Sequence, residues 1–150
     1  MSEPPATTPQ PRRLVFVSHS SEDTPIARQI ADRIEERGAA AFLDVNAIEV
    51  GMDFLDVIVE HLRRADELVV LWTAAALESR FVLTEVSIAW FRDIPIIQVV
   101  HGMTIGEMEV HPLLPLFLRS LHMTTLDELD TYLEQLARRV ADSTARRRGG

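Results

Sequence analysis

Short runs of consecutive apolar residues, many of them β-branched, recur along the chain and predict buried β-strands. The first run is LVFV at residues 14–17. The run ELVVLW at residues 67–72 is apolar enough to be covered on both faces of a sheet. Pro95 opens a later run at a position where a missing backbone N–H is tolerated. The predicted strands are residues 14–17, 39–43, 67–72, 94–100 and, as a short last strand, 121–124.

Between these runs, apolar residues recur at the spacing of amphipathic helices. Ile26, Ile30 and Ile34 form one apolar stripe, and Asp23 or Thr24 precedes it as a helix cap. Gly38 follows the stripe where a helix is expected to end. The other predicted helices lie around residues 54–62, 81–92 and 129–140, the last introduced by a capping box of Thr125 and Glu128. The predicted loops and irregular segments are residues 44–51, 73–79 and 101–119.

Strands and helices alternate along the chain. This alternation predicts an α/β fold with a parallel sheet and helices on both of its faces. In such folds ligands bind beyond the carboxyl ends of the strands. We therefore expect a functional site in the loops that follow the first three predicted strands.

The folded region is predicted to be a single domain that covers residues 13–142. Residues 1–12 hold half of the prolines and predict a disordered leader without the apolar segment of a secretory signal. Residues 143–150 predict a basic, flexible tail. No apolar stretch approaches the roughly 20 residues that cross a bilayer. We therefore expect a cytoplasmic protein that does not bind membranes.

The chain carries a net charge of −8 at pH 7 and contains no cysteine. An acidic chain without clustered lysines and arginines is not expected to bind nucleic acid. The lack of cysteine excludes disulfides, thiolate metal sites and thiol nucleophiles. The histidines show neither HxxxH nor HxH spacing, so no metal site is predicted.

A polar loop, SHSSED at residues 18–23, follows the first predicted strand and leads into a helix. Free N–H groups at a helix start favour anions, so the loop is a candidate phosphate-binding segment. An ordinary helix cap with a polar turn would explain the same residues. The glycine-rich phosphate loops, the GxSxG element of serine hydrolases and the acidic residues of phosphorelay receivers do not occur at the corresponding positions.

Glu85 lies in the third predicted helix among apolar residues that are expected to face the core. Phe81 precedes it by one helical turn, so both side chains project from one face. A carboxylate beside an aromatic ring near the carboxyl end of a sheet suits a site that holds a sugar and stacks a flat ring. The helix dipole also favours a glutamate near the start of a helix without any function. From the residues alone, both interpretations stay open.

Three segments, in this order, carry motifs of one known family. LVFVSHSSEDTPIARQIADRIEERG is similar to the family's opening motif, and FLDVNAIEVGMDFLDVI is similar to a strand followed by a mobile loop with a glycine, here Gly51. LVVLWTAAALESRFVLTEVSIAW is similar to a strand followed by S-x-W-x-x-x-E, which appears here as Ser79, Phe81 and Glu85. Over roughly residues 13–142, the chain resembles a Toll/interleukin-receptor (TIR) domain, most closely of the bacterial type.

The resemblance implies a flavodoxin-like fold with a five-stranded parallel sheet of order 2-1-3-4-5. Enzymatic TIR domains cleave NAD+ at the nicotinamide–ribose bond and release nicotinamide with ADP-ribose or a cyclic ADP-ribose isomer. Glu85 matches the family's catalytic glutamate, whereas Phe81 stands where the motif usually has tryptophan and offers a smaller aromatic ring. NAD+ is then the substrate, and no separate cofactor is expected.

The implied chemistry agrees with the residues that the chain offers. Nicotinamide leaves NAD+ as a neutral molecule, so no general acid is needed, and an anionic Glu85 would stabilise the oxocarbenium-like transition state. Arg80 could neutralise a phosphate, although an exposed arginine is also ordinary solvated surface. The residues predicted to contact the dinucleotide are Ser18, His19, Ser20, Ser21, Asp44, Gly51, Trp72 and Phe81.

Members of the family usually act after self-association, with the mobile loop of one copy completing the site of the next. The bacterial members imply a role in antiviral immune signalling. Other TIR domains are adaptors without activity, so a non-catalytic TIR–TIR interaction module is the alternative. A third hypothesis is another glutamate-dependent N-ribosyl enzyme, such as a nucleoside deoxyribosyltransferase.

Overall fold

The computed structural model describes residues 12–43, 51 and 53–149, with side chains described as far as Arg146. The predicted leader, apart from Arg12, lies outside the described residues. The strands are β1 (Leu14–Ser18), β2 (Ala40–Leu43), β3 (Glu67–Trp72), β4 (Ile96–Val100) and β5 (Met123–Thr125). All pair in parallel in the order β2-β1-β3-β4-β5, which confirms the predicted topology.

The central strand, β3, aligns the carboxyl ends of its neighbours. Every residue of β3 is buried, in agreement with the apolar run from Leu68 to Trp72. Ser18 at the end of β1 lies opposite Val70, and Trp72 at the end of β3 lies opposite Val100 of β4. The loops after β1, β3 and β4 therefore leave the sheet along one edge, which we call the carboxyl edge.

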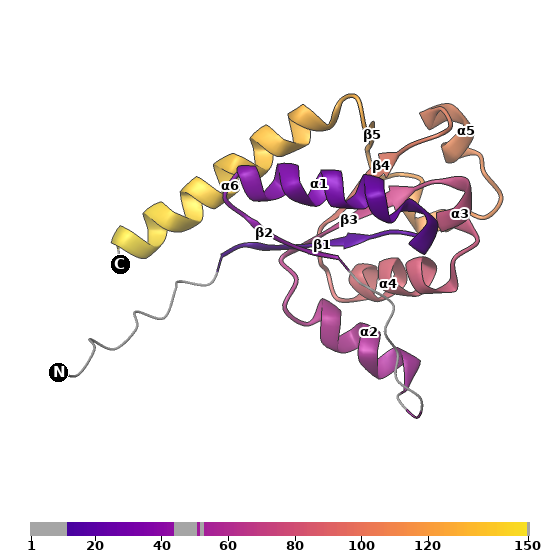
Figure 1. The fold of residues 1–150 in the computed structure, drawn as a ribbon, viewed down its shortest axis with the longest axis horizontal. Coiled ribbons are helices and arrows are strands. Elements are labelled where there is room, and N and C mark those ends of the chain that lie inside the picture. Colours follow the sequence, from indigo (N-terminus) through magenta and orange to yellow (C-terminus); the bar gives the residue numbers. More distant parts are fainter. Residues whose placement is uncertain (1–11, 44–50, 52, 150) are drawn as a thin grey trace.

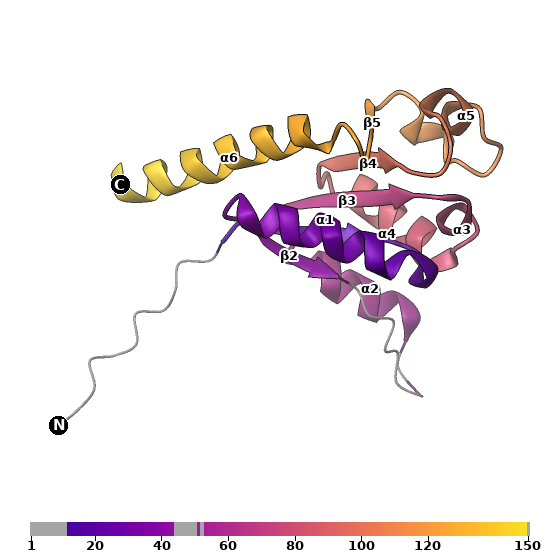
Figure 2. The same cartoon turned by 45° about the horizontal axis from the view of Figure 1, so that its top comes forward.

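Helices cover both faces of the sheet (Figure 1). The long helices are α1 (Thr24–Glu36), α2 (Phe54–Leu62), α4 (Arg80–Phe91) and α6 (Leu129–Gly149). The short ones are α3 (Ala74–Leu77), α5 (Ile105–Glu109) and the 3-10 helices η1 (Ser21–Asp23) and η2 (Leu116–Leu118). In Figures 1 and 2, α1 and α6 lie on one face, and α2 and α4 lie on the other.

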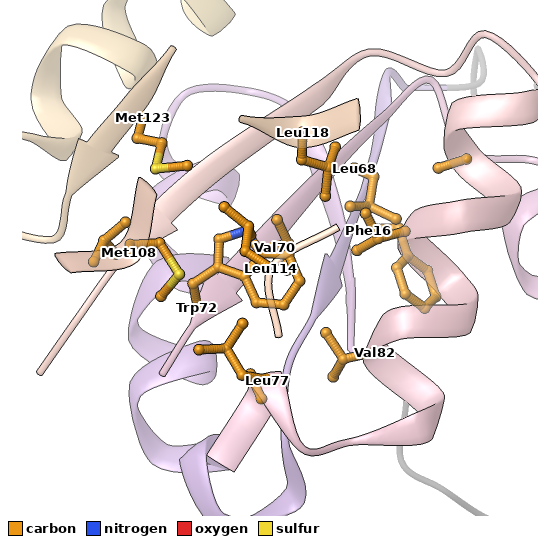
Figure 3. Close-up of a cluster of buried hydrophobic side chains, with 14 of the residues drawn as sticks. Phe16, Leu68, Val70, Trp72, Leu77, Val82, Met108, Leu114, Leu118 and Met123 are labelled. Carbon is orange, nitrogen blue, oxygen red and sulfur yellow. The ribbon is translucent and has the colours of Figure 1, made fainter. Parts of the chain in front are cut away.

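Alternation along the strands divides the core into two layers. In β1, Phe16 packs toward α2 and α4, whereas Val15 and Val17 pack toward α1 and α6. Figure 3 shows the first layer, in which the Trp72 indole is surrounded by side chains from β1, α3, α4 and the segment around η2. The layer between the sheet and α4 therefore continues up to the carboxyl edge.

Three short helices occupy segments that the sequence pattern predicted to be loops or irregular. They are α3 within residues 73–79, and α5 and η2 within residues 101–119. Each has at most 5 residues, which is too short to show a helical period. Side chains define two of their starts: Thr73 accepts from the backbone N–H of Ala76, and Thr104 forms a capping box with Glu107.

The last helix differs from its predicted start and end. The predicted capping box of Thr125 and Glu128 is wrong: the backbone N–H of Glu128 donates to the Thr125 carbonyl in a turn, and α6 begins only at Leu129. Its helical backbone continues to Gly149, beyond residue 142, because alanine and arginine in this stretch are strong helix formers. No helix of the described residues is both long and apolar enough to cross a bilayer.

A buried ionic cluster joins α6 to the amino end of β3. Glu67 accepts hydrogen bonds from Arg13 at 2.6 Å, from the Tyr132 hydroxyl at 2.9 Å, and from two nitrogens of Arg139 at 2.8 and 2.9 Å. Burial alone would raise the pKa of Glu67, but these hydrogen bonds outweigh it and hold the pKa below its usual value. Burial and the Glu67 carboxylate raise the pKa of Tyr132. The cluster therefore contains an ionised acid that is fully hydrogen-bonded.

Candidate active site

The carboxyl edge brings together the segments in which the sequence predicts a site. The loop after β1 passes through η1 into α1, and the residue after β3, Thr73, leads into α3. Figures 1 and 2 both place the turn into α1 and helix α3 at the same end of the sheet. The loops after β1 and β3 therefore converge as predicted, whereas the loop after β2, apart from Gly51, lies outside the described residues.

His19 is buried and braces the loop after β1. Its Nδ1 donates to the Val17 carbonyl at 3.0 Å, because a carbonyl oxygen can only accept. Its Nε2 lies 3.4 Å from the Thr24 hydroxyl oxygen, and this hydroxyl donates its single proton to the Ser21 carbonyl at 2.9 Å. Both ring nitrogens thus engage the loop itself, and the predicted contact of His19 with a dinucleotide stays a prediction.

The three serines of this loop have different surroundings. Ser18 is fully buried on the side of β1 that bears Phe16, and its hydroxyl has no hydrogen-bond partner among the described residues. Ser20 is buried and caps η1 by accepting from the Glu22 backbone N–H, whereas Ser21 is exposed. Buried hydroxyls without a partner are uncommon. The predicted contact of Ser18 with a dinucleotide stays a prediction.

Asp23 and Thr73 connect two loops of the carboxyl edge. The Thr73 hydroxyl donates to the Asp23 carboxylate at 2.5 Å, across 50 residues of sequence. Asp23 occupies the N-cap position of α1, as predicted, but its side chain makes no capping hydrogen bond there. Sequence reasoning missed Thr73; the available signal was a hydroxyl directly after a buried strand, at the edge where ligands bind in such folds.

Glu85 lies in the second turn of α4 with only 2% of its surface exposed. It shares the buried face of this helix with Val82, Val86 and Ala89, which pack in the layer between α4 and the sheet. Ser79 defines the helix start, since its side chain accepts from the Val82 backbone N–H at 3.3 Å. Acidic side chains are seldom buried to this degree in proteins. The predicted site acid is thus held inside the fold rather than on an outer surface.

Phe81 lies one turn before Glu85, as the motif spacing predicts. Its ring packs edge-on against Phe54, the first residue of α2, with ring centroids 4.4 Å apart. Phe81 is half-buried, so part of the ring is accessible. The contact joins the start of α4 to the start of α2, on the side where Gly51 precedes α2.

Trp72 belongs to the core in this structure. It is fully buried, and its indole N–H donates to the Gln98 side chain at 2.9 Å. The Gln98 amide in turn donates to the Leu118 carbonyl at 3.0 Å (Figure 3 shows Trp72 and Leu118). The indole therefore has a structural role here, and its predicted contact with a dinucleotide stays a prediction.

Of the remaining predicted residues, Gly51 precedes α2 and Arg80 begins α4. Asp44 lies outside the described residues. Gly51 is exposed with φ +93°, a left-handed conformation that favours glycine. Arg80, the first residue of α4, is exposed.

The described polar groups of this region are a carboxylate, several hydroxyls and backbone N–H groups. In the part of the chain that the structure describes, no group of three or more histidine, aspartate or glutamate side chains is placed to hold a metal ion. A carboxylate can stabilise positive charge on a sugar ring, and hydroxyls can bind its oxygens.

The sequence was compared with models of known protein families. The model described as a TIR domain matches residues 15–140. No curated protein matches the chain significantly.

Several solved structures share the fold at low sequence identity. The TIR domain of the Toll-related receptor TRR-2 from Hydra magnipapillata has a TM-score of 0.64 at 14% identity, over 85% of this chain and 97% of that one. The TIR domains of the activated Roq1 resistosome, which recognises the pathogen effector XopQ, have a TM-score of 0.57 at 12% identity, over 88% of this chain and 99% of that one.

A longer protein contains the same fold as one part. A metazoan TIR-STING receptor from C. gigas, in complex with 2′,3′-cGAMP, has a TM-score of 0.63 at 22% identity, over 91% of this chain and 42% of that one. These likenesses concern the fold, and the family model covers most of the chain. On that basis, the chain belongs to the TIR domain family.

Proposed function

We propose that this TIR domain is an NAD+ nucleosidase that cleaves the nicotinamide–ribose bond, with Glu85 as its catalytic residue. The observation that carries the proposal is the burial of Glu85 in α4, beside Phe81 and in the layer that reaches the carboxyl edge. A carboxylate withdrawn from bulk water interacts more strongly with a developing cation than an exposed one. The family to which the chain belongs includes NAD+-cleaving enzymes, which supports the same assignment.

The proposed reaction needs no acid, metal or resident cofactor. The bond between ribose C1′ and the nicotinamide nitrogen breaks, and its electron pair leaves with nicotinamide, which becomes neutral. Glu85 stabilises the oxocarbenium ion that forms. Water attack with loss of a proton then gives ADP-ribose, whereas attack by an adenine nitrogen gives a cyclic isomer. NAD+ is the substrate in this proposal.

The loop after β1 supplies the polar contacts for the rest of the dinucleotide. The Ser18 hydroxyl lacks a partner among the described residues and can receive a hydrogen bond from a ribose hydroxyl. Ser20 and Ser21 lie at the start of η1, where backbone N–H groups favour phosphate. Phe81 offers the accessible part of its ring to a flat base.

Access to Glu85 sets a condition on this activity. Since only 2% of the residue is exposed, ribose reaches it only in a conformation in which its covering groups have moved. We propose that self-association of TIR domains favours this conformation, and that the products act in bacterial antiviral signalling. The isolated chain at low concentration is then expected to be slow, and the rate per molecule is expected to rise with concentration.

The experiment is product analysis of NAD+ turnover by chromatography with mass detection, at increasing protein concentration. Wild type should release nicotinamide, and Glu85→Gln should lower the rate by about 100-fold or more without lowering the thermal midpoint. Glu78→Gln removes an exposed carboxylate at the end of α3 and serves as the matched control. An equal loss in both variants, or an unaffected Glu85→Gln, would refute the role of Glu85.

A non-catalytic interaction module is the second candidate, and a specific observation favours it. Several large apolar side chains lie at the surface, among them Phe91, 82% exposed, and Leu116, 74% exposed. Exposed apolar surface is typical of protein contacts. If wild type assembles but releases no nicotinamide at any concentration, this candidate replaces the enzyme.

Offering nucleosides instead of NAD+ tests the third hypothesis, a nucleoside-directed N-ribosyl enzyme.

A further inference from the structure

The hydrogen bond between Asp23 and Thr73 is the starting point of a second proposal. Asp23 ends η1 in the loop after β1, and Thr73 immediately follows β3. Their side chains meet at 2.5 Å, within the range of charge-assisted O–H···O⁻ bonds, which are about twice as strong as neutral ones. Thr73 is buried, so water competes weakly for its hydroxyl.

The Thr73 hydroxyl has a single proton, and this fixes the directions of its two hydrogen bonds. Because an ionised carboxylate can only accept, the proton points to Asp23, and a lone pair of the same oxygen accepts from the Ala76 N–H at 3.1 Å. Asp23 therefore orients the group that caps α3. A valine at position 73 would keep the shape of threonine but make neither bond.

The connection continues from α3 to the helix that bears Glu85. Only Glu78 and Ser79 separate α3 from α4, and the Ser79 backbone N–H donates to the Ala76 carbonyl at 3.0 Å. Ser79 then caps α4. A displacement of the start of α3 is thus transmitted to α4 over a few residues.

The other end of the connection is also held by hydrogen bonds. The loop after β1 is braced by His19, whose two nitrogens engage Val17 and Thr24. The Asp23 backbone N–H also donates to the Ser20 carbonyl at 2.8 Å. Asp23 is therefore firmly joined to the serines of the loop.

From these contacts we infer that Asp23 and Thr73 are a positioning pair that holds the serine loop, residues 18–21, at a defined distance from the helix that carries Glu85. This inference rests on the proposed function for its catalytic meaning, but the pair itself touches neither ribose nor nicotinamide. Misplacement of reacting groups by about 1 Å can cost 100-fold in rate. The pair would therefore affect turnover without taking part in the chemistry.

The kinetic test compares substitutions at both positions in the full chain with NAD+. Thr73→Val and Asp23→Ala should each lower kcat by about 10- to 100-fold. Thr73→Ser keeps the hydroxyl and Asp23→Asn keeps an accepting oxygen, so both should retain most of the rate. The double variant Asp23→Ala/Thr73→Val should be no slower than Thr73→Val alone, because each substitution already removes the bond between the two side chains. Additive losses, or equal rates for Thr73→Val and Thr73→Ser, would overturn the inference.

Amide hydrogen exchange provides a readout that does not depend on activity. Thr73→Val should speed exchange at Ala76 and through residues 18–24, whereas Thr144→Val, which removes a hydroxyl bonded within α6, should change neither segment. If wild type cleaves no NAD+, the proposed function fails while the exchange data still decide whether the pair holds the loop. Unchanged exchange in folded Thr73→Val and Asp23→Ala would reject the positioning pair.

Discussion

At the residue scale, Phe81 combines a packing role with a proposed binding role. Its ring contacts Phe54 while part of it stays accessible. Loss of an aromatic contact with a base costs about 1 kcal/mol, which corresponds to roughly a 5-fold change in binding. This side chain therefore offers a way to separate binding from chemistry in the proposed reaction.

We expect Phe81→Leu to raise the KM for NAD+ about 5-fold with a smaller change in kcat, in contrast to Glu85→Gln, which should lower kcat. Steady-state kinetics of nicotinamide release measures both constants. Glu78→Gln, the exposed control used above, should match wild type in both constants. If Phe81→Leu lowered kcat and left KM unchanged, a role of Phe81 in binding would be contradicted.

Asp93 has the only left-handed conformation of a non-glycine residue in the described chain, with φ +58°. It follows the end of α4, where its N–H donates to the Trp90 carbonyl and that of Ile94 to the Ala89 carbonyl. A β-branched residue is strained in this conformation. We expect Asp93→Val to lower the free energy of unfolding by about 1–2 kcal/mol, and Asp93→Gly to be neutral or stabilising. Urea denaturation distinguishes them, and equal stabilities would contradict the argument.

At the element scale, the turn between α1 and β2 is packed against α6. Gly38 has φ +92°, and a Cβ at this position would lie 3.2 Å from Cγ1 of Val140. Gly102, with φ +83°, has no such neighbour within 4 Å in the described structure. A substitution would strain the backbone at either glycine, but only at Gly38 would the new side chain also press against α6.

We expect Gly38→Ala to lower the free energy of unfolding by about 2 kcal/mol, and Gly102→Ala by about 1 kcal/mol. When Val140→Ala is added to each of these two variants, they should lose the same amount of stability, because Val140→Ala deletes the methyl group that a Cβ at position 38 would crowd. Chemical denaturation of the four variants tests this. If the difference persists without Val140, crowding against α6 is not its cause.

Helices and strands could be predicted from the sequence where their apolar residues form a run or recur at a regular spacing. β3 occurs at residues 67–72 as predicted, because an unbroken apolar run needs no information about neighbours. The start of α6 was misplaced, because a Thr-x-x-Glu pattern matches a capping box whether or not the backbone begins a helix there. The Asp23–Thr73 bond was not predictable, since it joins residues 50 positions apart that only the sheet register brings together. For Glu85, the spacing predicted the buried face but not the degree of burial.

At the scale of the whole molecule, Glu67 and its partners join the start of the sheet to α6. The chain reaches this cluster from three distant segments: Arg13 before β1, Glu67 in β3, and Tyr132 with Arg139 in α6. Removal of one member of a buried, hydrogen-bonded charge cluster leaves the others unsatisfied. The Glu67 carboxylate therefore joins the segment before β1 and helix α6 to β3.

The lowered pKa of Glu67 predicts the direction of the pH dependence. Because the carboxyl is more acidic in the folded than in the unfolded state, it stabilises the fold above its unfolded pKa. That contribution is lost as pH falls toward the folded pKa. We expect Glu67→Gln to lower stability by about 2–3 kcal/mol at pH 7, and the difference from wild type to shrink below about pH 4.

Thermal melts of wild type and Glu67→Gln between pH 3 and pH 7 would measure this difference. Glu60→Gln removes the acid of an exposed pair with Arg63 at 3.6 Å and serves as the control, with little effect at any pH. A constant gap between wild type and Glu67→Gln across the acid range would show that the charge of Glu67 is not the source of its stabilisation.

Helix α6 extends away from the sheet toward the C-terminus, which determines how many copies of the domain could be attached to one surface (Figure 1). Its last turn lies at the opposite end of the strands from α3 and the turn into α1 (Figure 1). Copies anchored to a bead, vesicle or fused scaffold through this end would all present the same loops outward, unobstructed by the tether. Tethering can raise local concentrations to the millimolar range, so a crowded array could be built without covering Ser21 or the accessible part of Phe81.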